Sequence, residues 1–209
     1  MNRMRLIIPL VFMFSLQLMK SNAAEENESY DDRYCTTCHG ADGRGNYGVQ
    51  APRLAGMEDW YLKRQLESYR AGLRGVHPRD IEGVAMQPMA AKLTDESIAE
   101  ILDWVGSWEY KPSEVTIQGD AMAGREFYSV CATCHGAEGE GNQGFVAPAL
   151  AGQNDWYLVT QLKNFLAGYR GNQPGDTYGQ QMAIMAQTLA SEGDIINVVS
   201  YINTLGKGK

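Results

Sequence analysis

The amino-acid sequence repeats itself once, at a constant offset of 96 residues. Residues 34–96 align without a gap with residues 130–192. Both copies contain D-W-Y-L, which begins at Asp59 and Asp155, and L-A-G, which begins at Leu54 and Leu150. A period of this length is that of a whole small domain and not of a solenoid unit. The sequence therefore predicts two similar domains in tandem.

The first 24 residues have the pattern of an export signal. Arg3 and Arg5 precede an apolar run from Leu6 to Met19, and small residues follow as far as Ala24. The run has 14 residues, and a membrane-spanning helix needs about 20. A retained anchor is the alternative, but we expect residues 1–24 to be a cleaved signal peptide and the mature protein to be periplasmic.

Each copy is predicted to be all-α. Asp59 and Asp155 are placed to cap a helix, and apolar residues recur at three- and four-residue spacing over 98–108 and 195–205. Proline, serine and glycine interrupt the helical pattern between the copies. We expect the first domain at 25–111, a linker at 112–118 and the second domain at 119–209. The glycine-rich loops leave each copy a thin core, so each should need something to fold around.

All four cysteines lie in two C-x-x-C-H motifs, Cys35–His39 and Cys131–His135. This is the haem c attachment signature, because two thiols can bond to one porphyrin edge while the next imidazole reaches the iron. A thiol-redox pair does not require the histidine, and 92 residues between the two C-x-x-C pairs is too far for a zinc ribbon. The sequence therefore predicts two covalently bound haem c groups, held by Cys35, Cys38, Cys131 and Cys134, with His39 and His135 on the iron atoms.

The second axial ligand is expected at a residue that occurs in both copies. His77 is matched by Gln173, which excludes a second histidine ligand common to both copies, and no cysteine is spare. The methionine pairs Met86/Met182 and Met89/Met185 do match. One methionine of each copy is then a ligand and the other fills the core, and spacing alone does not choose between them.

Four motifs carry a resemblance to a known family: C-x-x-C-H-G, A-P-x-L-A-G, W-Y-L-x-x-Q-L and M-x-x-M-A-x-x-L. Both copies resemble class I cytochrome c domains, each wrapped around one haem, and the tandem resembles the di-haem cytochrome c4 family. The resemblance implies Met86 and Met182 as axial ligands, with Met89 and Met185 as the fallback. It also implies that the carbonyl groups of Pro52 and Pro148 hold the haem-ligating histidines.

The first copy departs from the family pattern at its start. The second copy has Gly124 and Tyr128 on its first helix and Tyr201 on its last, as the family does. The first copy has Glu28 and Asp32 at the positions of the glycine and the tyrosine. We expect its first helix to be short, shifted or more mobile.

The resemblance implies an electron carrier and not an enzyme, with no small-molecule substrate. The formal net charge is −7, and removal of the signal peptide would make it −10, which excludes a nucleic-acid binder and favours a basic partner surface. The expected partner is a redox protein such as a membrane oxidase or reductase complex, with peripheral membrane association allowed. The alternative is a di-haem subunit or redox enzyme, peroxidase-like or sulfur-oxidising, that feeds a larger complex.

One repeated pair has two interpretations. Arg74 and Arg170 each precede a glycine at matched positions. They are expected either to bind the haem carboxylates or to stabilise the C-terminal end of a helix through its dipole.

Overall fold

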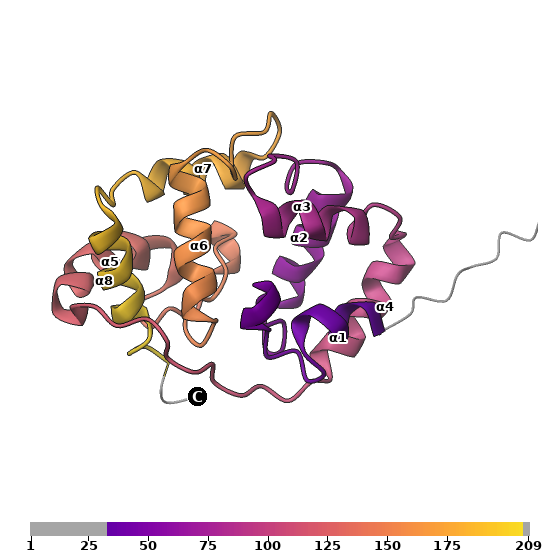
Figure 1. Cartoon of the computed structure of the whole chain (residues 1–209), viewed down its shortest axis with the longest axis horizontal. Coiled ribbons are helices and arrows are strands. Elements are labelled where there is room, and N and C mark those ends of the chain that lie inside the picture. The colour runs from indigo at the N-terminus through magenta and orange to yellow at the C-terminus, as the bar shows by residue number, and fades with distance from the viewer. Residues whose placement is uncertain (1–32, 207–209) are drawn as a thin grey trace, which may run out of the picture.

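The computed structural model describes residues 33–206, and within them the chain forms two helical halves that lie side by side (Figure 1). The predicted signal peptide, Glu28 and Asp32 lie outside the described residues. Only two isolated bridges, at Asn46–Ala51 and Asn142–Ala147, are extended pairings in this part of the chain. The all-α prediction is therefore confirmed. None of the helices in residues 33–206 is long and apolar enough to cross a membrane.

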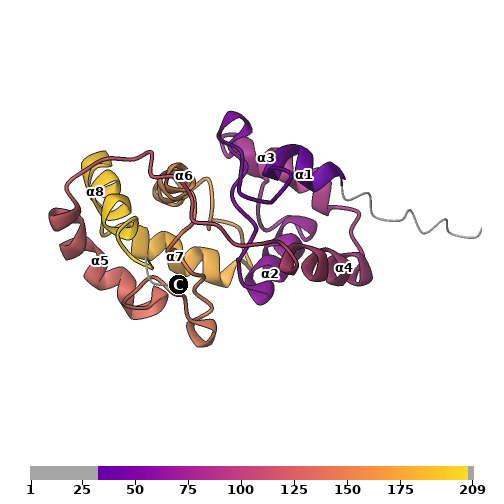
Figure 2. The same ribbon diagram turned by 90° about the horizontal axis from the view of Figure 1, so that it is seen from below.

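The two halves have the same order of elements, as the repeat predicts. The first half consists of α1 (Arg33–His39), the 3₁₀ turn η1 (Tyr47–Val49), α2 (Asp59–Arg70), α3 (Ile81–Ala90) and α4 (Asp95–Gly106). The second consists of α5 (Ala121–His135), η2 (Gln143–Phe145), α6 (Asp155–Leu166), α7 (Thr177–Ala186) and α8 (Glu192–Ile202). Residues 107–120, which contain no helix, run along one edge of the molecule from α4 to α5 (Figures 1 and 2).

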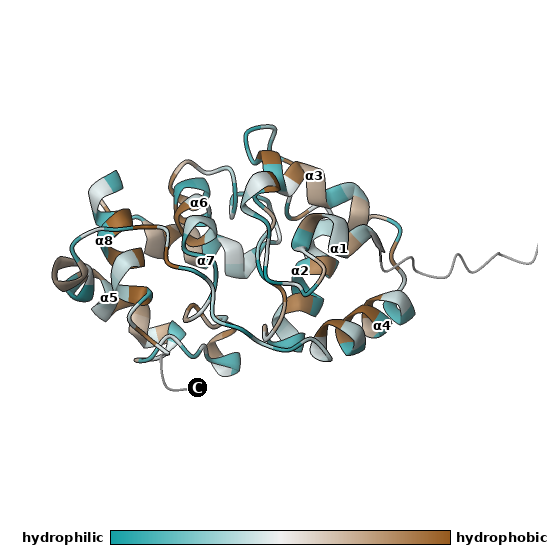
Figure 3. Cartoon of the chain, turned by 60° about the horizontal axis from the view of Figure 1, so that its bottom comes forward, coloured by the Kyte–Doolittle hydropathy of each residue, from teal (hydrophilic) through white to brown (hydrophobic). Residues whose placement is uncertain are grey.

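The last helix of each half is amphipathic. In α4 the side chains of Ile98, Ile101 and Val105 are buried, and apolar and polar residues alternate around the helix (Figure 3). Thr94 caps this helix by accepting a hydrogen bond from the Ser97 N–H at 3.1 Å. Apolar spacing and capping residue together explain why the helix forms and where it begins.

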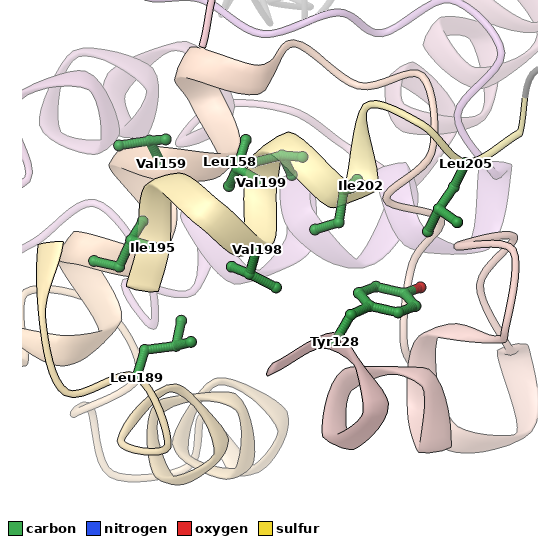
Figure 4. Packing of buried hydrophobic residues seen from close by; sticks show 9 residues of the cluster. All are labelled: Tyr128, Leu158, Val159, Leu189, Ile195, Val198, Val199, Ile202 and Leu205. Atoms are coloured by element: carbon green, nitrogen blue, oxygen red, sulfur yellow. The ribbon is translucent and has the colours of Figure 1, made fainter. Parts of the chain in front are cut away.

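The core of the second half is the larger of the two clusters found in the described residues. Tyr128 of α5 lies beside the α8 residues Val198, Val199 and Ile202 (Figure 4). Its ring packs on Tyr201 with centroids 5.3 Å apart. Gly124 lies directly against the backbone of α8 at Asn197, where a Cβ atom would not fit. These contacts confirm the predicted packing of the first helix on the last in this copy.

The interface between the halves is built twice from equivalent residues. Arg74 donates hydrogen bonds to the Tyr157 hydroxyl at 3.1 Å and to Gln161 Oε1 at 3.2 Å in the other half. Its repeat counterpart Arg170 donates to the counterparts of those residues, Tyr61 at 3.4 Å and Gln65 at 3.1 Å. Each half therefore offers the same surface to the other, as in a two-fold symmetric dimer.

A second pair of interface contacts follows the same rule but with different chemistry. The Ala149 N–H donates to the Glu58 carboxylate at 3.0 Å, and the Arg53 N–H donates to the Asn154 side-chain oxygen at 2.7 Å. Glu58 and Asn154 are repeat counterparts, as are Arg53 and Ala149. The acceptor of the backbone N–H of the other half is therefore a carboxylate in the first half and a side-chain amide oxygen in the second.

The linker is fixed to the second half by one carboxylate. Asp155 is fully buried and accepts hydrogen bonds from the Thr116 N–H (2.6 Å), the Thr116 hydroxyl (2.7 Å) and the Ile117 N–H (2.8 Å). The prediction that Asp155 and Asp59 cap their helices is wrong. Each is the first helical residue, and the capping positions belong to Asn154 and Glu58. The side chain of Asp155 is used by the linker instead.

Candidate functional site

The two C-x-x-C-H motifs lie on the last turns of α1 and α5. In each motif the cysteines are three residues apart and therefore lie on one face of the helix. The glycine that follows, Gly40 or Gly136, has a φ of 84° or 83°, which glycine adopts at low cost. It turns the chain away directly after the histidine. Both helices consequently end with two thiols and one imidazole at the same end.

Each motif histidine is held by a carbonyl group thirteen residues further along the chain. His39 Nδ1 lies 2.7 Å from the Pro52 carbonyl oxygen, and His135 Nδ1 lies 2.7 Å from that of Pro148. Because a carbonyl only accepts, Nδ1 carries the proton and donates it, and Nε2 has its lone pair available. This confirms the expected role of the two prolines.

Burial keeps both imidazole rings neutral. Each ring is 7% exposed. Loss of hydration lowers the pKa of His39 and of His135, and the hydrogen bond to the proline carbonyl opposes this only in part. A neutral ring with a fixed tautomer is the form that binds a metal. Both histidines therefore suit axial ligation of a haem iron.

A cavity in the second half collects the predicted site residues of that copy. Cys131, Cys134 and His135 line it together with Met182 and Met185 of α7. Burial raises the pKa of the Cys131 thiol to about 11, so an unmodified Cys131 would remain protonated. Two thiols, one neutral imidazole and two thioethers around a mainly apolar cavity fit a covalently bound haem.

The first half carries the same residues on the equivalent elements. Cys35, Cys38 and His39 lie at the end of α1, and Met86 and Met89 lie on α3. Met89 has 52% of its surface exposed, whereas Met86 is half-buried. No group of three or more histidine, cysteine, aspartate or glutamate residues in the described part of the chain could hold a metal ion by itself.

The wall of this cavity also contains residues of the first half. Arg74 is one that the sequence indicated as a candidate for the haem carboxylates, whereas Tyr61, Arg64 and Gln65 were not identified. Only a contact between residues about 100 positions apart brings them there, and no local pattern indicates such a contact. The internal repeat was the one available signal, because a tandem of similar domains invites a symmetric interface.

Arg74 and Arg170 both line this cavity. Nη2 of each donates across the interface, and Nη1 of each donates at 2.6 Å to the glutamine of its own half, Gln65 or Gln161. His77 has a partner in the other half. It is half-buried, and its ring stacks on Tyr169 of the other half with centroids 4.6 Å apart.

Comparison with known proteins agrees with the geometry. The cytochrome c family model matches twice, at residues 24–109 and 121–206. A thiosulfate dehydrogenase electron acceptor of Stutzerimonas stutzeri is 32% identical over 83% of this chain and 79% of its own length. Cytochrome c4 of Pseudomonas aeruginosa is 31% identical over 82% of this chain and 83% of its own. The cytochrome c4 structure of Acidithiobacillus ferrooxidans, 25% identical, superposes with a TM-score of 0.67 over 84% of this chain and all of that one.

Proposed function

This chain belongs to the cytochrome c family, as a di-haem member of the cytochrome c4 type, and on that basis we propose that it carries single electrons between redox proteins in the periplasm. As a member of this family it is an electron carrier and not an enzyme, with two covalently bound haem c groups. The observation that supports the proposal best is the pairing in each copy of a carbonyl-held, neutral histidine with two cysteines in the last turn of the same helix.

The residues of each site have distinct roles in this proposal. Cys35 and Cys38, and likewise Cys131 and Cys134, form the covalent bonds to the haem. His39 and His135 supply the first axial nitrogen, and Met86 and Met182 the second axial ligand. Haem bound by these residues would supply one-electron chemistry, because its iron can be ferric or ferrous.

The protein's contribution is to fix the ligands and to keep the sites closed. The carbonyl groups of Pro52 and Pro148 prevent the imidazole rings from turning, so little rearrangement accompanies a change of charge. A methionine on the opposite face leaves no open coordination position for a substrate. A carrier needs both properties, because an open site would react with small molecules.

Two measurements test this function. A pyridine haemochrome assay on acid-acetone-washed protein should count two haems per chain. Carbon monoxide should leave the spectrum of the reduced protein unchanged, because both positions on each iron are filled. One haem per chain, or rapid carbon monoxide binding, would contradict the proposal and favour an enzyme with an exchangeable ligand.

The relatives suggest one class of electron donor. A similar protein accepts electrons from a thiosulfate dehydrogenase, and we extend that role to this chain as a candidate. The experiment mixes the oxidised protein with thiosulfate and a purified thiosulfate dehydrogenase in a stopped-flow spectrometer. Reduction of both haems at a rate that depends on the dehydrogenase concentration supports the assignment. Reduction no faster than with thiosulfate alone removes this donor and leaves the carrier function intact.

The distribution of charge supports a basic docking surface on the partner. Residues 25–118 carry a net charge of −7 and residues 119–209 one of −3. In the first half, Glu96, Glu100 and Asp103 are exposed along α4 at helical spacing. Charge of this kind mainly accelerates the encounter between transient partners, and we infer that a basic partner approaches the first half.

Ionic strength provides the test for this docking preference. The Debye length falls from about 30 Å at 0.01 M salt to about 10 Å at 0.1 M, so the second-order rate with a basic partner should fall steeply. The double variant Glu100→Gln/Asp103→Asn should flatten that dependence more than the control Glu126→Gln/Glu138→Gln, whose residues are exposed in the second half. If both variants flatten the salt dependence of the rate equally, the net charge alone causes that dependence, and the proposed preference for the first half is wrong.

A further inference from the structure

One asymmetry of the interface lies at an arginine of the first half that lines the cavity of the second half. This arginine is Arg64 of α2. Its repeat counterpart on α6 is Thr160, whose hydroxyl donates to the Trp156 carbonyl of its own helix at 3.0 Å. The first domain therefore supplies a cation to the second site, and the threonine at the equivalent position of the second domain carries no charge.

Arg64 is held in place by the second half. Its Nη2 donates to the Val146 carbonyl at 2.9 Å, and its guanidinium group lies over the Tyr178 ring, 4.4 Å from the centroid. Both contacts cross the interface. The guanidinium group also lies 5.7 Å from the centroid of the Trp60 ring of its own helix. Its hydrogen bond and its nearer aromatic contact are made with the second half.

One nitrogen of this guanidinium group has no partner in the protein. Nη1 of Arg64 is buried and makes no hydrogen bond within the described residues. A buried N–H of a charged group without an acceptor is costly, and native structures rarely contain one. Since Arg64 lines the cavity that holds the haem-binding cysteines, the missing acceptor is expected from the bound group. Haem presents carboxylates, the acceptor that a guanidinium group prefers.

The residue that accepts the Nη2 bond is itself under strain. Val146 has a φ of 57°, in the left-handed region, where a β-branched side chain is rarely found. Its counterpart Gln50 has a similar φ of 54°, but glutamine is not branched at Cβ. Strained residues of this kind occur where the surroundings fix them, often beside a bound ligand. Arg64 thus fixes the loop on one side and faces the cavity on the other.

We propose that Arg64 is a positioning residue through which the first domain sets the reduction potential of the second haem. Nη1 binds a haem carboxylate, and Nη2 fixes the Val146 loop at the cavity wall. The proposal rests on the haem sites assigned above. According to this proposal, one arginine of the first domain causes a difference in reduction potential between two haem sites that are otherwise similar because of the repeat.

The sign of the effect follows from charge. An oxidised haem carries one more positive charge than a reduced haem, so a nearby guanidinium cation disfavours oxidation. By neutralising a carboxylate it removes a group that favours oxidation. Both effects raise the potential of the second haem, and loss of Arg64 should lower it. At the effective dielectric of protein sites such an interaction shifts an equilibrium by roughly three- to tenfold.

The test compares Arg64→Gln and Arg64→Lys with a matched control, Arg79→Gln. Arg79 also crosses the interface, by donating to the Tyr169 hydroxyl at 3.0 Å, but does not line the cavity. Spectroelectrochemical titration followed by NMR of the haem methyl groups gives each potential separately. Arg64→Gln should lower only the second, by three- to tenfold in the redox equilibrium, or about 30 to 60 mV at 59 mV per tenfold change. In Arg64→Lys the potential of the second haem should lie between those of the wild type and Arg64→Gln. Arg79→Gln should shift the potential of neither haem.

Two results would overturn the proposal. One is a second-haem potential in Arg64→Gln equal to that of the wild type. The other is an equal fall of both potentials in Arg64→Gln and Arg79→Gln, which would mean general loosening of the interface. A pyridine haemochrome count of each variant keeps these outcomes separate from failure of the haem assignment, since two haems must be present before any potential is compared.

Discussion

Replacing Asp155 by asparagine should destabilise the second domain. The carboxylate accepts five hydrogen bonds. Oδ1 accepts from the Thr116 hydroxyl and the Trp156 N–H, both at 2.7 Å. Oδ2 accepts from the N–H groups of Thr116 (2.6 Å) and Ile117 (2.8 Å) and from Asn203 Nδ2 (3.1 Å). An asparagine amide would place an NH₂ group against at least two of these donors, whichever way it turned.

The magnitude follows from the cost of those donors. A hydrogen bond to a charged group contributes about 1.5–3 kcal/mol, and a buried donor without an acceptor costs about 1–3 kcal/mol. These contributions are not additive, so we expect a loss of about 2–4 kcal/mol in the free energy of unfolding. The matched control is Asp59→Asn, the repeat counterpart. Asp59 is exposed, and its replacement should change stability by less than about 0.5 kcal/mol.

Urea denaturation followed by tryptophan fluorescence and circular dichroism measures both variants. The reasoning is refuted if Asp155→Asn unfolds at the same urea concentration as Asp59→Asn. Acid provides a second test. Burial acts to raise the pKa of Asp155, but the hydrogen bonds from Thr116, Ile117 and Trp156 outweigh it and lower the pKa. Its stabilisation is therefore complete above the unfolded value of about 3.9 and is lost as the pH falls through the lower folded pKa. The difference between wild type and Asp155→Asn should shrink below about pH 4.

Two further predictions concern the axial ligands and the linker. Met86→Ala and Met182→Ala should each remove about half of the weak sulfur-to-iron absorption of the oxidised protein, while alanine at the other methionine of each pair should leave it unchanged; the reverse pattern would move the ligand by one turn of helix. Gly152→Ala should destabilise the fold by about 1–3 kcal/mol in urea denaturation, because Gly152 has a φ of 76° and a Cβ there would overlap the Tyr110 hydroxyl. Gly168→Ala, at a φ of 70° with nothing within 4 Å, is the control and should cost only about 1 kcal/mol.

Much of the fold could be predicted because the repeat and the apolar spacing are local signals. Ile98, Ile101 and Val105 mark the buried face of α4 by their positions alone. Gly124 and Tyr128 mark the packing of α5 on α8, because only a small residue permits so close an approach. In each case the physical cause acts within one helix or between elements of one copy.

What could not be predicted depends on contacts between the copies. His77 has the local sequence of an exposed turn, and only Tyr169 of the other half gives it a stacking partner. Asp155 has the position of a helix cap, yet the linker provides the donors for its carboxylate. Lys63 and Arg64 are neighbouring cations on one helix, and the sequence does not indicate that of the two only Arg64 lines the cavity of the second half. These roles appear only once the docking of the halves is known.

The paired contacts across the interface relate the two halves of the chain as a two-fold axis relates the subunits of a dimer. In a dimer of separate identical subunits, every substitution appears on both sides of the two-fold axis, and the two cofactors remain equivalent. Joining the subunits removes that constraint, so the positions of Arg64 and Thr160, or of Glu58 and Asn154, differ while the contacts around them stay matched. Covalent continuity therefore allows the residues around two copies of one site to differ.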